Sequence, residues 1–133
     1  MILCDANLLL YAYNASAPEH PKARVWLENR LSSPSPFALS WSTIGAFLRL
    51  ATHRAIFPAP YSIAEATRIA DAWLGRPMVV VLEPGPEESN ARGSLVADAL
   101  LAALALEHGA TLATHDLDFR RFEGLSLLDP VAA

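Results

Sequence analysis

Residues 1–12 read MILCDANLLLYA and place one acid, Asp5, between two apolar runs. The run before it is typical of a short buried strand, and Leu8, Leu9 and Leu10 are typical of a helix that begins directly afterwards. An ionised carboxylate in such surroundings costs several kcal/mol unless a partner offsets it. Asp5 therefore needs either a structural partner, for example as the N-cap of the helix, or a function.

Length and composition indicate one globular domain spanning residues 1–133. A chain of this size buries roughly two thirds of its unfolded surface, so a core forms without disulfides. The single cysteine, Cys4, lies in the first apolar run and is expected to be a buried thiol. The sequence contains neither a leader pattern nor the roughly 20 apolar residues of a membrane span, so we expect a cytoplasmic protein without membrane contact.

The formal net charge of −4 argues against general affinity for nucleic acid over the whole surface. A local basic rim remains compatible with this charge, because separate arginines can cluster once the chain folds. The candidates for such a rim are Arg49, Arg54, Arg92, Arg120 and Arg121.

Further along the chain, helical and strand patterns alternate. Helices are predicted within 8–14, 20–31, 44–53, 61–75 and 95–108, and strands at 37–41, 77–84, 110–114 and 124–130. This alternation predicts an α/β sandwich of three layers, with a mainly parallel central sheet flanked by helices.

Several helix ends carry recognisable signals. Ser42 or Thr43 is expected to cap the helix at 44–53, and Ser62 and Glu65 have the spacing of a capping box. Glycines are expected to close two helices, Gly75 after the fourth and Gly109 after the fifth.

Acids recur at the ends of the apolar elements. Asp5 follows the first strand, Asp98 lies in the first turns of the Ala-rich helix, and Asp116 and Asp118 follow the strand at 110–114. The carboxyl ends of parallel strands share one edge of a sheet, where ligands bind, so we expect these acids to lie close together. Each acid alone also has a structural explanation as a helix cap, a first-turn acid or a loop residue.

An acidic cluster has energetic consequences. Two carboxylates about 4 Å apart repel by roughly 4 kcal/mol at an effective dielectric constant of about 20, and a small domain has only about 5 to 15 kcal/mol of stability. The cluster thus requires raised pKa values, a basic partner or a cation. Carboxylate oxygens suit Mg²⁺ or Mn²⁺ rather than Zn²⁺. Such an ion activates water and neutralises phosphoryl charge, so a phosphodiester is the natural substrate.

Three segments resemble PIN-domain ribonucleases of the VapC toxin type, over nearly the whole chain. They are DANLLLYA at 5–12, WSTIGAFLRLATHRAIF at 41–57 and LVADALLAALALEHGATLATHDLDF at 95–119. The last is the most specific, with an acid, an Ala-rich helix, E-H-G-A, a strand and T-x-D-x-D-F in that order. The resemblance implies a single PIN-like α/β domain.

The resemblance also implies a metal centre. Asp5, Asp98 and Asp116 match the residues that coordinate Mg²⁺ or Mn²⁺, and Asp118 matches a position that completes or supports the cluster. Members of the family are metal-dependent endoribonucleases that hydrolyse RNA phosphodiesters. The resemblance further implies a homodimer, held inactive by a cognate VapB-type antitoxin whose C-terminal segment covers the acidic groove.

Three further residues have implied or candidate roles. Asn7 and Thr114 match positions that orient the acids by hydrogen bonds. Arg49 lies three residues after Ala46, on the same predicted helix face, and is a candidate phosphate contact. The alternative for Arg49 is a surface salt bridge.

Two features depart from the family pattern. Many members carry a glutamate in a motif like L-x-E-x-x-R, whereas the matching stretch here, IGAFLRL, has Ala46 at that place and Gly45 before it. Fewer acids would weaken metal binding, which leaves open a catalytically weakened module that binds RNA or an antitoxin without cleavage. The connection at 83–93 is also shorter than expected, since the family usually has a further helix there.

Other chemical signals are weaker. None of the four histidines has zinc-ligand spacing to another, and His115, beside Asp116, is the best candidate among them for a substrate contact. Trp26, Trp41 and Trp73 are expected to pack in the core or a dimer interface, with base stacking as the alternative for Trp41. No glycine-rich nucleotide-binding motif or G-x-S-x-G motif is present.

Overall fold

The computed structural model describes residues 1–82 and 94–132. Within these residues a five-stranded sheet has the order β3-β2-β1-β4-β5, and every neighbouring pair of strands is parallel. The strands are β1 (Ile2–Cys4), β2 (Phe37–Ser40), β3 (Val79–Leu82), β4 (Thr111–Ala113) and β5 (Leu127–Leu128). The predicted parallel α/β sheet is confirmed, whereas the predicted short connection at 83–93 lies outside the described residues.

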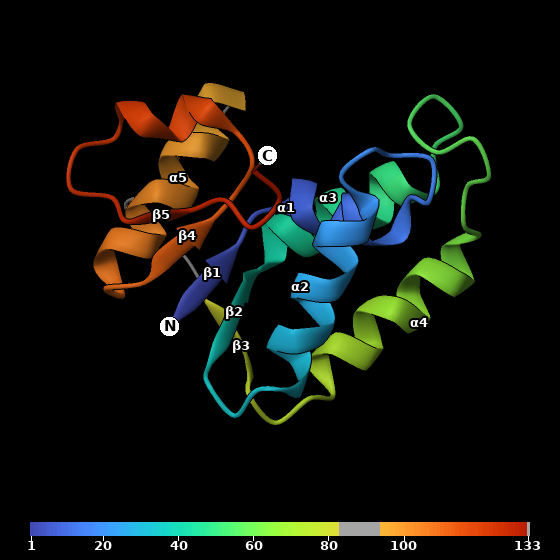
Figure 1. The fold of residues 1–133 in the computed structure, drawn as a ribbon, viewed down its shortest axis with the longest axis horizontal. Coiled ribbons are helices and arrows are strands. Elements are labelled where there is room, and N and C mark those ends of the chain that lie inside the picture. Colours follow the sequence, from blue (N-terminus) through green and yellow to red (C-terminus); the bar gives the residue numbers. More distant parts are fainter. Residues whose placement is uncertain (83–93, 133) are drawn as a thin grey trace.

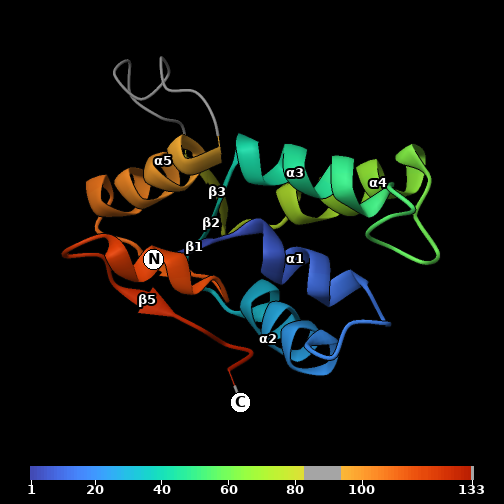
Figure 2. The same cartoon turned by 90° about the horizontal axis from the view of Figure 1, so that it is seen from above.

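Helices cover both faces of this sheet. They are α1 (Ala6–Tyr13), α2 (His20–Ser32), α3 (Trp41–Ala51), α4 (Ile63–Leu74), α5 (Ser94–Glu107) and the short 3-10 helix η2 (Leu117–Arg121). Figures 1 and 2 show α1 to α4 on one side of the sheet and α5 on the other, where Phe119 of η2 packs into the same core as α5. Among the helices of the described ranges, none has the length and apolar character needed to cross a membrane.

Strand side chains alternate between the two faces, as the period of two requires. Cys4 and Leu39 belong to the core under α1 to α4, whereas Leu3 and Ala38 belong to the core under α5. All four side chains are fully buried. The prediction that Cys4 is a buried thiol is therefore confirmed.

Two helices begin earlier than their sequence patterns predict. Asp5 is the N-cap of α1, so this helix starts at Ala6. Ser40 caps α3, and its hydroxyl accepts a 3.1 Å hydrogen bond from the backbone N–H of Thr43. The prediction of Ser42 or Thr43 as the cap was wrong because β2 passes into α3 without a loop, so the last strand residue is also the cap.

Other helix ends agree with the sequence in part. The capping box of α4 is confirmed, because Ser62 and Glu65 each bond the other's backbone N–H. Gly109 follows α5 with φ of 61°, a left-handed conformation that favours glycine. Gly75 closes α4 as predicted, and with φ of −77° it does so without a left-handed conformation.

The tryptophans differ in burial. Trp73 is 2% exposed and Trp26 packs against the core of α1 to α4, as predicted. Trp41 is 53% exposed in the first turn of α3, so it does not pack in the core, and its other predicted roles, packing in a dimer interface or base stacking, stay predictions.

Candidate functional site

The sheet topology brings distant acids to one edge. β1 and β4 are parallel neighbours, and Cys4 pairs with Ala113 at their carboxyl ends. The next residues, Asp5 and Thr114, therefore lie side by side at this edge. The backbone N–H of Asp5 donates a 2.9 Å hydrogen bond to the carbonyl of Ala113, which continues the ladder into the site.

The hydroxyl of Thr114 connects the residues of this edge. It donates a 2.7 Å hydrogen bond to Asp5 Oδ2 and accepts bonds from Asn7 Nδ2 at 3.3 Å and from the backbone N–H of Asp116 at 3.0 Å. The other oxygen of Asp5 accepts a 2.7 Å bond from the N–H of Ala6. Both carboxylate oxygens of Asp5 are thus held in place, Oδ2 by Thr114 with support from Asn7 and Oδ1 by the backbone of Ala6.

Burial and neighbouring charge disfavour ionisation of Asp5. Burial raises the pKa of its carboxyl group above the ordinary value, and the charges of Asp98 and Asp116 raise it further. The hydrogen bonds from Thr114 and Ala6 lower the pKa in part, but they do not reverse the net shift. Asp5 therefore carries unrelieved electrostatic repulsion when it is ionised.

Asp98 in α5 shares this environment. Burial raises its pKa first, and the charges of Asp116 and Asp118 add to the effect, whereas Arg121 lowers it. The predicted acids accordingly lie close enough for their charges to interact. A cation between them would relieve the repulsion that raises the pKa of Asp98 and Asp5.

The structural explanations for the acids also hold. Asp5 caps α1, and Asp116 caps η2 by accepting a 2.9 Å hydrogen bond from the backbone N–H of Asp118. Asp118 lies in the first turn of η2 and is exposed. Capping leaves each carboxylate with free lone pairs, so it does not compete with ligand binding.

The donor set is suited to a hard cation, although the side chains do not form a closed cage. Within residues 1–82 and 94–132, no group of three or more Asp, Glu, His and Cys side chains is arranged to hold a metal ion. Mg²⁺ does not need three protein ligands, because it commonly binds one or two carboxylates and completes its coordination shell with waters and substrate phosphates. Oriented carboxylate oxygens with raised pKa values fit such an ion, and the three-carboxylate centre stays a prediction.

Basic residues flank the acids on η2. Arg121 Nη2 lies 3.7 Å from Asp98 Oδ2, and Arg120 lines a cavity of about 170 Å³ together with Asp116. Arg49 lies in the last turn of α3 and is exposed, and within the described ranges it makes no ion pair. Its predicted phosphate contact stays a prediction, and Arg92 lies outside the described residues.

His115 has partners that the sequence did not reveal. Its Nδ1 lies 2.8 Å from Asp129 Oδ2, and its ring packs edge-on against Tyr11 with centroids 5.9 Å apart. The ring also lines the cavity that contains Asp116 and Arg120. Asp129 lies in the turn after β5, where no spacing relates it to His115, so sequence reasoning had no signal for this pair.

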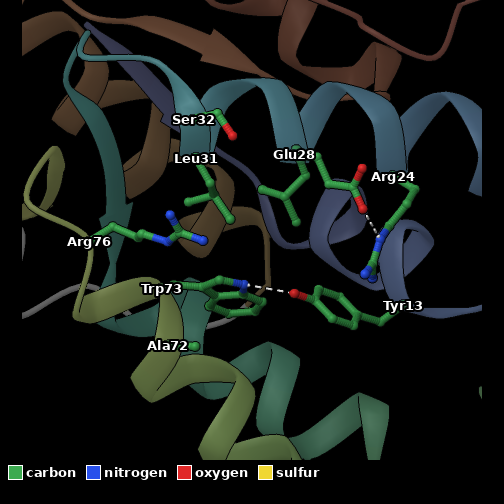
Figure 3. Close-up of a pocket in the computed structure, with 9 residues that line it drawn as sticks. Tyr13, Arg24, Glu28, Leu31, Ser32, Ala72, Trp73 and Arg76 are labelled. Carbon is green, nitrogen blue, oxygen red and sulfur yellow. Dashed lines mark hydrogen bonds and ion pairs between the residues drawn. The ribbon is translucent and has the colours of Figure 1, made fainter.

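A second cavity, of about 260 Å³, lies between α1, α2 and α4. Figure 3 shows the Trp73 indole pointing at the hydroxyl of Tyr13, and the side chains of Arg24 and Glu28 paired on the opposite wall. None of the carboxylates of the sheet edge lines this cavity. Arg76 completes the lining beside Trp73.

Comparison with known proteins agrees with this architecture. The family model described as PIN domain matches residues 2–125. Ribonuclease VapC37 of Mycobacterium tuberculosis is 39% identical over 143 aligned residues, covering 99% of each chain. The structure of VapC20 from the same organism, described as a sarcin-ricin loop cleaving toxin, superposes with a TM-score of 0.65 at 23% identity, over 90% of this chain and 93% of that one.

A third comparison concerns a protein whose structure was solved as a complex. The VapBC2 complex of Rickettsia felis, bound to a DNA fragment from its promoter, matches with a TM-score of 0.65 at 18% identity, over 96% of this chain and 98% of the matched chain. The parallel sheet with carboxylates at one edge defines an α/β protein of the PIN-like class. The chain belongs to the PIN-domain family and, within it, to the VapC ribonucleases.

Proposed function

We propose that this protein is a Mg²⁺- or Mn²⁺-dependent endoribonuclease and the toxin of a toxin–antitoxin pair. Asp5, Asp98 and Asp116 would hold the ion, and Asp118 would support the cluster. When bound, the ion activates a water molecule as nucleophile and neutralises charge on the scissile phosphate. The relatives named ribonuclease support the reaction class.

One observation carries this proposal. Asp5 and Asp98, from different elements, both have raised pKa values, and the charge of Asp116 raises both. A fold built for stability alone has no need to bring several carboxylates together, so the arrangement is typical of a functional site. Thr114 fixes the orientation of the Asp5 carboxylate, and Asn7 supports Thr114, which limits the reorganisation needed when a cation binds.

The partners follow from the family relation. The structural neighbour from Rickettsia felis is a VapBC complex. We infer that this chain likewise binds a cognate VapB-type antitoxin that blocks the acidic edge, that it acts as a homodimer, and that it works in the cytoplasm. RNA is the proposed substrate.

The test is cleavage of a labelled pool of structured RNA with Mn²⁺, comparing the parent with Asp98→Asn and Ala46→Glu. We expect cleavage by the parent, its loss in Asp98→Asn, and its loss in the parent when EDTA removes the ion. Cleavage that persists in Asp98→Asn or in EDTA would contradict the proposed mechanism.

A second candidate function is a module that binds RNA or an antitoxin without cleaving RNA. It is favoured by Ala46, which stands in α3 where many relatives have an acid. Activity restricted to Ala46→Glu would establish this candidate, because the parent would then lack one essential ligand. Thermal unfolding with and without Mn²⁺ also separates the two functions. If the metal site is assembled, Mn²⁺ binding stabilises the folded protein by RT ln(1 + [L]/Kd), whereas no shift would favour the binding module.

A further inference from the structure

Arg121 lies beside the acidic edge and is held there by more than charge. Its Nη2 is 3.7 Å from Asp98 Oδ2, and its guanidinium carbon lies 4.8 Å from the centre of the Phe122 ring. Phe122 in turn packs against the core under α5. The Phe122 ring attracts the guanidinium group, so Arg121 has a second contact at this edge besides Asp98.

The ion pair itself is weak and exchangeable. The Arg121 side chain is 42% exposed and that of Asp98 is 31% exposed, and their separation exceeds hydrogen-bonding distance. Partly exposed pairs of this kind contribute little to stability. Arg121 neutralises the edge only in part, because burial and the charges of Asp116 and Asp118 keep the pKa of Asp98 raised.

The acidic edge should repel the proposed RNA substrate. RNA is a polyanion, the chain has a net charge of −4, and the proposed scissile phosphate must approach several carboxylates. Two arginines, Arg120 and Arg121, are adjacent in η2, and each lies beside one of these acids. Guanidinium groups bind phosphate oxygens in a bidentate manner, which lysine does not do.

We propose that Arg121 is a substrate-binding residue that exchanges partners, serving as the counter-ion of Asp98 in the free protein and binding an RNA phosphate once a divalent ion occupies Asp98. This inference rests on the proposed ribonuclease function. The exchange keeps the acids partly neutralised before the ion arrives, and it places a cation beside the phosphate afterwards.

The exchange predicts two effects of opposite sign for Arg121→Gln. Mn²⁺ affinity, measured by calorimetry without RNA, should increase about two- to fivefold, because no side-chain cation competes for Asp98. Affinity for a fluorescent single-stranded RNA should fall, and the slope of log K against log salt should decrease by about 0.7, as expected for one lost phosphate contact. Arg68→Gln, on the exposed face of α4, is the matched control and should show neither change.

A double-mutant cycle tests the partner exchange in EDTA, where the proposed cleavage does not proceed. Asp98→Asn releases Arg121, so the loss of RNA affinity caused by Arg121→Gln should be larger in the Asp98→Asn background than in the parent. Arg121→Lys should retain part of the RNA affinity, because it keeps the positive charge but cannot bind a phosphate through two hydrogen bonds as a guanidinium group does. If Arg121→Gln lowers the melting temperature substantially, Arg121→Met, which also removes the charge, serves as the variant in both measurements.

The outcomes are distinct. Equal RNA affinity and equal salt slopes for Arg121→Gln and Arg68→Gln would overturn the inference, as would additive effects in the cycle. If the parent cleaves RNA but Arg121→Gln binds RNA like Arg68→Gln, or the cycle is additive, the inference fails and the proposed function stands. If the parent neither binds nor cleaves RNA, the proposed function fails and the inference fails with it.

Discussion

The hydroxyl of Thr114 donates a 2.7 Å hydrogen bond to the carboxylate of Asp5 across 109 positions of sequence. The same oxygen accepts from Asn7 and from the backbone of Asp116, so its hydrogen-bonding capacity is used fully. Thr114 is 3% exposed, which leaves little room for water to replace it. One of the two oxygens of Asp5 is therefore fixed by a hydroxyl group that follows the neighbouring strand, while the backbone of Ala6 holds the other.

Thr114→Val should destabilise the protein by about 1 to 3 kcal/mol, because a buried acceptor on Asp5 and a donor on Asn7 lose their partner. Thr114→Ser keeps the oxygen and should cost only about 1 kcal/mol for the missing methyl group. Urea denaturation measures both. Equal losses for the two variants would show that the hydroxyl contributes little.

Asp5→Asn should reveal the raised pKa as a pH-dependent gain in stability. At pH values below the ordinary value of 3.8, the carboxyl is protonated in both the folded and unfolded states, so its pKa shift contributes no penalty. As the pH rises, the unfolded chain ionises first, and the native state becomes progressively less stable until its own pKa is passed. The free energy gained by Asp5→Asn should therefore increase from acid toward neutral pH and then level off.

Urea denaturation in EDTA across this pH range is the measurement for Asp5→Asn. Altered hydrogen bonding to Thr114 and Ala6 adds an offset that does not depend on pH, so the slope is the informative quantity. A difference that stays constant with pH would contradict the raised pKa.

Two glycine substitutions should have opposite signs. Gly45 lies inside α3 and Gly109 has φ of 61°, and a Cβ atom added at either position has no atom of the described residues within 4 Å. Gly45→Ala should stabilise by about 0.5 to 1 kcal/mol through helix propensity. Gly109→Ala should destabilise by about 1 to 2 kcal/mol through left-handed strain. Thermal unfolding of both variants checks the signs, and a stabilising Gly109→Ala would refute the assigned conformation.

Tyr13→Phe should lower the stability of the protein, because it removes a hydrogen bond at the cavity shown in Figure 3. Trp73 Nε1 donates a 3.0 Å hydrogen bond to the Tyr13 hydroxyl, and Trp73 is buried. Removing the acceptor should cost about 1 to 3 kcal/mol, or a melting temperature lower by about 3 to 10 °C in a chain of this size. An unchanged melting temperature would mean that water in the cavity replaces the hydroxyl.

Local signals predicted much of the fold. Alternating apolar runs located the strands and helices, and the Ser62–Glu65 capping box was readable because all its bonds lie within four residues. The acids at strand ends were identified because parallel topology sends those ends to one edge. The resemblance to a known family implied orienting roles for Asn7 and Thr114, and in the structure Thr114 donates to Asp5 and Asn7 donates to Thr114.

The rest depended on contacts between distant residues. The pairs Arg121–Asp98 and His115–Asp129 join elements whose relative position no periodicity encodes. Trp41 was expected in the core or in a dimer interface, and the start of α3 leaves it half exposed in the single chain. The cap at Ser40 was missed because strand patterns do not mark where a following helix begins.

The pairing of β1 with β4 also determines when the acidic edge can form during synthesis. β1 consists of Ile2–Cys4, but its partner β4 begins at Thr111, so a nascent chain shorter than this holds Asp5 without Thr114 and without one side of its ladder. Such non-local pairing is slow to form and comes late in folding. The acidic edge is consequently assembled from residues 109 positions apart in sequence, and a chain synthesised only as far as α5 has no such edge.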